Sequence, residues 1–153
     1  MKRNEWHWSW SFPEVVTGCV LILSAAVFAA DLTVTVDNVK ENKGAVHVVI
    51  YDAPSWMDGN PNNFSGSHSV DITKRKDDGP LVTHVELEPD QYCAFVYHDL
   101  NANDKLDKKL LGLPKEPYAF SGPFNKRRIP RFEECMFAVG EEAAAAISVR
   151  LQK

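Results

Sequence analysis

The chain has 153 residues, of which 17 are Lys or Arg and 21 are Asp or Glu, and its formal net charge is −4. Binding to nucleic acid requires a concentrated basic face, so this mildly acidic balance argues against a nucleic-acid partner. The length suits one domain with a single core.

Residues 1–29 have the order of a secretory signal peptide, because a basic start precedes an uncharged apolar run from Val15 to Ala30. We expect cleavage near Ala30, which leaves a single mature domain of residues 30–153 in the periplasm or outside the cell. A leader that stays uncut, or lipid attachment at Cys19 in the sequence VTGC, would instead tether the protein to a membrane.

Alternation of apolar and polar residues predicts a series of short strands. They are expected at residues 32–37, 45–51, 69–75, 81–87, 92–98, 136–139 and 145–151. Between the second and third lies a loop rich in Gly, Pro and Asn, whose only large apolar residues are Trp56, Met57 and Phe64. We expect these three side chains to pin the loop onto the body of the domain.

The strand at residues 92–98 is apolar on both faces, so both faces have to be covered. One cover is an opposing sheet. The other is the segment Lys108–Cys135, whose many large apolar residues predict an ordered flap rather than a solvated linker. About seven strands with a long ordered loop between the late ones predict an all-β, antiparallel β-sandwich, with a partly open barrel as the alternative.

An acidic loop follows this strand, with oxygen-bearing residues at the spacing of a calcium-binding loop. The expected ligands at positions one, three, five, seven and nine are Asp99, Asn101, Asn103, the carbonyl of Lys105, and Asp107. Position twelve holds Leu110 instead of the usual Glu, so Glu116 or Glu133 from the flap would have to substitute. Binding of Ca²⁺ is therefore expected to be weak, and an Asx-rich turn that caps its own backbone is the alternative.

A ligand or a protein partner is expected on the face that carries this loop and the flap. Its candidate residues are His98, Tyr118, Phe120, Arg127 and Arg128. Tyr118 and Phe120 are either anchors of the flap or an aromatic platform, and the two arginines belong to a basic run that either receives an anion or is simply solvated. The second function considered is a small periplasmic enzyme using His98 and Asp99, although no nucleophile motif accompanies them.

Two further pairs of residues remain open. His47 and His84 lie on expected strands and would form a metal pair if they met across a sheet, although no third ligand stands at a recognisable spacing. Cys93 and Cys135 would be able to form a disulfide in an oxidising compartment, but we favour two separate buried thiols. Tyr92 follows a Pro-containing turn and is expected to form a tyrosine corner.

The chain resembles a family of small exported bacterial proteins known as domain of unknown function 2141. The likeness rests on the segments LTVTVDNVKENKGAVHVVIYD, PDQYCAFVYHD, DLNANDKLD, LGLPKEPYAFS and RFEECMF. The resemblance implies export and a sandwich of the transthyretin or immunoglobulin kind, and it implies no known activity. Asp90, Ala102 and Asp104 stand where glycine is usual in the family. We therefore expect a non-enzymatic, exported binding module.

Overall fold

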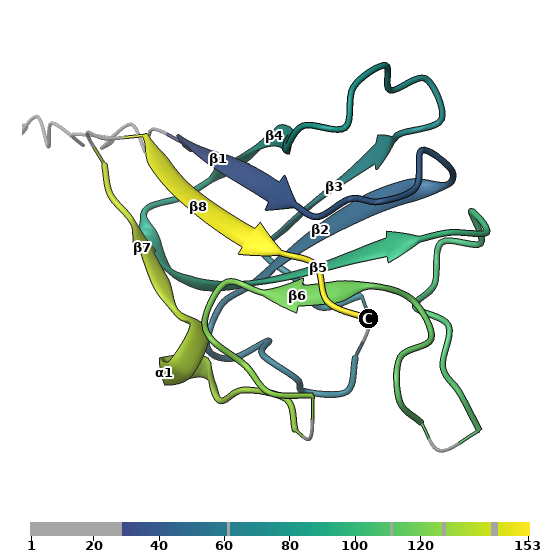
Figure 1. Ribbon diagram of the computed structural model, residues 1–153. Helices are drawn as coiled ribbons and strands as arrows, with labels where there is room; N and C mark the ends of the chain where they lie inside the picture. Colours follow the sequence, from purple (N-terminus) through teal and green to yellow (C-terminus); the bar gives the residue numbers. More distant parts are fainter. Residues whose placement is uncertain (1–28, 61, 111, 127, 142–143) are drawn as a thin grey trace, which may run out of the picture.

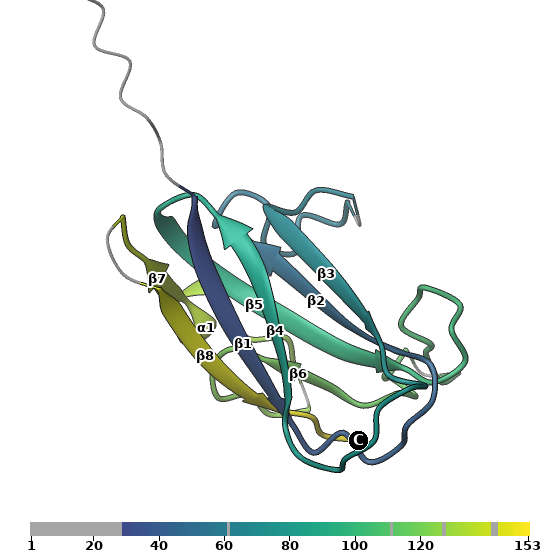
Figure 2. The same ribbon diagram turned by 90° about the horizontal axis from the view of Figure 1, so that it is seen from above.

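The structure, a computed structural model, is an all-β sandwich, and it describes residues 29–153 except 61, 111, 127, 142 and 143. The predicted leader therefore lies, but for residue 29, outside the described residues. Within them, no helix is both long and apolar enough to cross a membrane. The described part forms two sheets (Figures 1 and 2).

The smaller sheet has three strands in the order β4 (Leu81–Leu87), β1 (Ala30–Asp37) and β8 (Ala145–Arg150). The larger sheet has five strands, with the order β3 (Gly66–Asp71), β2 (Ala45–Tyr51), β5 (Asp90–Asp99) and β6 (Tyr118–Phe120), and with β7 (Phe137–Val139) also paired to β5. One short helix, α1 (Phe132–Cys135), precedes β7.

The pairing of β1 with β8 is parallel, whereas the other strand pairs of the two sheets are antiparallel. The predicted antiparallel β-sandwich is confirmed, with this one parallel pair as its exception. β7 pairs with β5 in the larger sheet, so the chain crosses to the smaller sheet before β8 begins. β8 then runs beside β1 in the same direction, with Leu32 opposite Ala145.

The core lies between the two sheets and follows the alternation predicted from the sequence. On β1, Leu32, Val34 and Val36 are fully buried, while the side chains between them are partly exposed. On β5, Ala94 and Val96 point into the same core, and the hydroxyl of Tyr92 donates a hydrogen bond of 2.9 Å to the carbonyl of Glu88. The predicted tyrosine corner is therefore confirmed.

The region between β2 and β4 differs from the prediction in two ways. β3 begins at Gly66 rather than Ser69, because Gly66 already pairs with Ile50, and it ends where the side chain of Asp71 accepts the backbone N–H of Thr73 at 2.9 Å. Trp56 packs against the body as predicted, but Met57 and Phe64 are each 42% exposed and do not pin the loop.

The outer face of β5 is covered by a second apolar cluster, as its composition requires. Its members are Trp56, Cys93, Phe95, Tyr97, Tyr118, Phe120, Phe124, Phe132 and Cys135. The cover comes in part from residues 121–135, which we call the lid, and which lies below β6 in Figure 1. The predicted flap is thus only partly right, because β6, which falls inside it, joins the sheet by pairing with Phe95–Tyr97.

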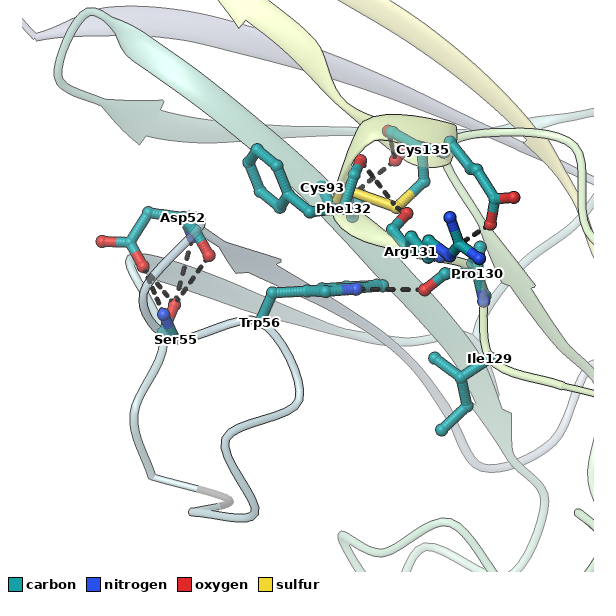
Figure 3. Close-up of a disulfide and its surroundings, with 12 residues drawn as sticks. Asp52, Ser55, Trp56, Cys93, Ile129, Pro130, Arg131, Phe132 and Cys135 are labelled. Atoms are coloured by element: carbon teal, nitrogen blue, oxygen red, sulfur yellow. Dashed lines mark hydrogen bonds between the residues drawn. A yellow bond between two sulfur atoms is a disulfide. The ribbon is translucent and has the colours of Figure 1, made fainter.

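A disulfide between Cys93 and Cys135 fastens the lid to β5, with the two Cα atoms 5.4 Å apart (Figure 3). The preference for two separate thiols is wrong, because α1 places Cys135 directly over the outer face of β5. Close to the disulfide, the indole N–H of Trp56 donates to the carbonyl of Pro130 at 3.1 Å. The lid is thus held by a covalent bond, a partly buried hydrogen bond and aromatic packing.

Reduction of the disulfide should lower the free energy of unfolding by roughly 3 to 4 kcal/mol, because the bridge closes a loop of 42 residues in the unfolded chain. Urea unfolding with and without dithiothreitol measures this difference. In the Cys93→Ala, Cys135→Ala double variant the reductant should have no effect. Equal stability of the oxidised and reduced protein would contradict the assignment of the bridge.

Candidate functional site

The acidic loop, residues 99–107, leaves the end of β5 beside the turn between β1 and β2 (Figure 1). Gly44 in that turn has φ +71°, and a Cβ there would lie 1.9 Å from the carbonyl oxygen of Asp99. Only glycine allows so close an approach. The turn therefore closes one side of the loop.

Asp99 is fully buried, and both of its carboxylate oxygens accept backbone hydrogen bonds from the loop. The N–H of Asn101 donates to Oδ1 at 3.2 Å, and the N–H of Asp104 donates to Oδ2 at 2.7 Å. A buried carboxylate requires such donors, since desolvation of an unpaired charge is costly. These two bonds wrap the loop around the Asp99 side chain.

Two of the remaining predicted ligands, Asn101 and Asn103, bond a third, Asp107. Its carboxylate accepts the side-chain amide of Asn101 at 3.1 Å and that of Asn103 at 3.2 Å. The backbone N–H of Lys105 donates to the side-chain oxygen of Asn103 at 3.0 Å, which turns the chain at position seven. The side chains at positions one, three, five and nine are thus gathered in one loop.

Glu116, one of the two glutamates considered for the missing acid at position twelve, places its carboxylate against the loop. It is 3% exposed, and it accepts the backbone N–H of Leu100 at 2.8 Å and that of Asp107 at 3.0 Å. Of the two glutamates considered as substitutes, Glu116 lies at the loop, whereas Glu133 lies in α1. Leu110, at position twelve, is fully exposed.

His47 on β2 also faces the loop, which sequence reasoning missed. It is 9% exposed and stacks on Tyr97 with the ring centroids 4.7 Å apart. Its Nε2 lies 3.6 Å from Asp99 Oδ2 and 3.8 Å from Asp104 Oδ1, and it has no hydrogen-bond partner. Burial, and after it the negative charges of Asp99 and Asp104, raises the pKa of Tyr97 to about 12.

The predicted pair of His47 and His84 does not form. His47 belongs to the larger sheet and His84 to the smaller one, where its Nδ1 lies 3.1 Å from Asp31 Oδ2. His84 is exposed, whereas His47 is buried.

Three residues expected on the partner surface are buried and do not form a surface themselves. His98 is 1% exposed, Tyr118 8% and Phe120 6%. The ring Nε2 of His98 lies 2.9 Å from the carbonyl of Lys43, so the histidine ties the turn between β1 and β2 to β5. Tyr118 and Phe120 serve as anchors, and His98 has no access to a substrate in this arrangement.

The outer rim of the lid forms a shallow hollow of about 370 Å³. It is lined by Pro123, Phe124, Asn125, Arg128, Pro130 and Glu134. Arg128 donates two hydrogen bonds of 2.6 Å to the carboxylate of Glu134, so its charge is already paired. Arg127 lies outside the described residues.

Comparison with known families gives one match, over residues 34–147, to a family described as "Uncharacterized protein conserved in bacteria (DUF2141)". Neither the curated proteins nor the solved structures gave a match.

Ala102→Gly should raise the free energy of unfolding by about 1 kcal/mol, because Ala102 has φ +55°, a conformation that costs a side chain energy. Chemical denaturation measures the difference. Ala53→Gly is the matched control, since Ala53 is an exposed loop alanine without positive φ and should lose stability on substitution. A loss of stability in both variants would contradict the left-handed conformation of Ala102.

Glu134 should titrate with a pKa of about 2 rather than 4.5, because Arg128 and the N–H of Arg131 donate hydrogen bonds to its carboxylate. A lowered carboxyl pKa stabilises the fold above pH 4.5, and this contribution is lost as the pH falls through about 2. Arg128→Gln should return the midpoint towards 4.5 in an NMR titration of the carboxyl carbon, and Arg150→Gln should not. An unchanged midpoint in Arg128→Gln would show that the pair does not form in solution.

Proposed function

Since this chain belongs to the DUF2141 family, whose description names no activity, we propose from the geometry of the loop that it is an exported, non-enzymatic binding module whose acidic loop holds Ca²⁺. The observation that carries the proposal is Glu116, a buried carboxylate that reaches the loop from outside its sequence. It adds a third carboxylate to Asp99 and Asp107, the two that the sequence pattern supplies.

The chemistry of the loop fits a hard cation that prefers oxygen ligands. Asp99, Asp107 and Glu116 offer carboxylates, and rotation of the Asn101 and Asn103 amides by half a turn would present oxygen instead of nitrogen. Without a cation, these amide groups donate to Asp107, and the loop stays gathered. A preformed loop of this kind loses less entropy when an ion binds.

The affinity expected for Ca²⁺ is low. Lys105, Lys108 and Lys109 lie in or next to the loop, and Asp99 and Glu116 already bond backbone N–H groups. These features suit the extracellular class of calcium modules, with a Kd of about 10⁻⁴ to 10⁻³ M. The role of the ion would be to brace the loop for contact with a partner.

Export is supported by the disulfide, because such bonds form and persist in oxidising compartments. A partner surface is supported by the loop that joins β5 to β6, where Leu110 is 104% exposed and Leu113 51%. Large apolar side chains gathered at an exposed tip are typical of contact sites. The partner, a protein or a small ligand, would contact this tip.

The geometry of His98 and Asp99 does not favour the alternative function, a small enzyme that uses these two residues. Both side chains are buried, and each is already bonded to backbone groups.

Calcium at about 1 mM should stabilise the protein by about 1.4 kcal/mol if the Kd is near 10⁻⁴ M, which corresponds to a rise in Tm of about 5 °C. Thermal melts in Ca²⁺ and in chelator measure this shift. Asp107→Asn should abolish it. Asp90→Asn, at the opposite end of β5, should retain it. A Tm of the unmodified protein that is the same in Ca²⁺ and in chelator would rule out the calcium loop.

A further inference from the structure

The side chains of His47, Asp99 and Asp104 meet at the point where β5 passes into the acidic loop. Their three candidate ligand atoms lie within 4.8 Å of one another. His47 is directly opposite Tyr97 in the ladder between β2 and β5, and Asp99 lies two residues further along β5. Residues two apart on a strand share a face, so this register brings the imidazole beside the Asp99 carboxylate.

Asp104 reaches the same point from the loop. Its backbone N–H bonds Asp99 Oδ2 at 2.7 Å, which folds the loop back over the end of the strand. Its Oδ1 then lies 3.8 Å from His47 Nε2, while most of its side chain remains open to solvent. The cluster therefore has two buried members and one exposed member.

His47 Nε2 is the observation that sets this cluster apart from an ordinary group of acids. The residue is 9% exposed, the ring is held by stacking on Tyr97, and Nε2 has no hydrogen-bond partner although it points at two carboxylates. A buried polar atom without a partner is uncommon in native proteins and calls for an explanation. A cation between the imidazole and the carboxylates supplies one.

We propose that His47 Nε2, Asp99 Oδ2 and Asp104 Oδ1 bind a divalent first-row transition metal of the Zn²⁺ type, with water completing the coordination. Ligand atoms about 2.0 to 2.2 Å from a tetrahedral Zn²⁺ stand about 3.3 to 3.5 Å from one another. The separations of 3.6 and 3.8 Å from Nε2 exceed this by only a few tenths of an ångström. They are too long for a hydrogen bond between the groups.

The donor set selects the class of metal. An imidazole nitrogen suits Zn²⁺, Cu²⁺ or Ni²⁺, whereas Ca²⁺ prefers a site made of oxygen atoms alone. The site shares Asp99 with the proposed calcium loop but uses neither Asp107 nor Glu116. The proposed Zn²⁺ site therefore does not depend on Ca²⁺ binding by the loop.

Titration calorimetry with ZnCl₂ on the purified protein should give one site per chain. His47→Phe keeps the stack on Tyr97 and removes the ligand nitrogen, so it should weaken Zn²⁺ binding at least tenfold, and Asp104→Asn should weaken it in the same direction. His84→Phe is the matched control, since it removes an exposed histidine beside an aspartate, and it should bind Zn²⁺ as the unmodified protein does. Asp107→Asn should also retain Zn²⁺ binding, which separates this site from the calcium loop.

NMR of the histidine ring nitrogens in the unmodified protein gives a second readout that depends on no variant. One equivalent of Zn²⁺ should shift the Nε2 resonance of His47 and leave that of His84 in place. Unchanged Zn²⁺ affinity in His47→Phe, or a shift confined to other histidines, would overturn the proposal.

Discussion

The structure depends on a single strand, β5, that is apolar on both faces. One face packs into the core between the two sheets, and the other requires a separate cover. A sheet open to water on that side would leave Phe95 and its aromatic neighbours exposed. The lid covers part of this surface, with Phe95 and Tyr97 left half-buried, and the bond between Cys93 and Cys135 keeps the lid in place without a large core of its own.

Burial also determines how the carboxylates at the end of β5 are hydrogen-bonded. The last two residues of the strand, His98 and Asp99, are both buried where the chain turns into the acidic loop. The charge of Asp99 is compensated by two backbone N–H groups, and Glu116 is compensated in the same manner from the other side. The loop is thus shaped by the need to satisfy two buried carboxylates, and this shape draws its remaining oxygen atoms together.

Much of this arrangement follows from local sequence patterns. Alternation on β1 and β4 and the doubly apolar β5 are properties of consecutive residues, and each predicted its strand correctly. The spacing of Asp99 to Asp107 is equally local, and the calcium site that it predicted stays a prediction. The parallel pairing of β1 with β8 and the disulfide depend on where distant segments cross, which no local period encodes. His47 was missed as a neighbour of Asp99 for the same reason, because their proximity depends on the register between β2 and β5.

Both proposals require the buried carboxylate of Asp99 to be a cation ligand. A crystal structure of the protein grown with Ca²⁺ and Zn²⁺, with anomalous difference maps recorded above and below the zinc edge, would show whether it is. We expect metal density within about 2.5 Å of an Asp99 carboxylate oxygen. An ordered loop in which Asp99 bonds only the N–H groups of Asn101 and Asp104, with no metal density beside it, would show that Asp99 binds no cation.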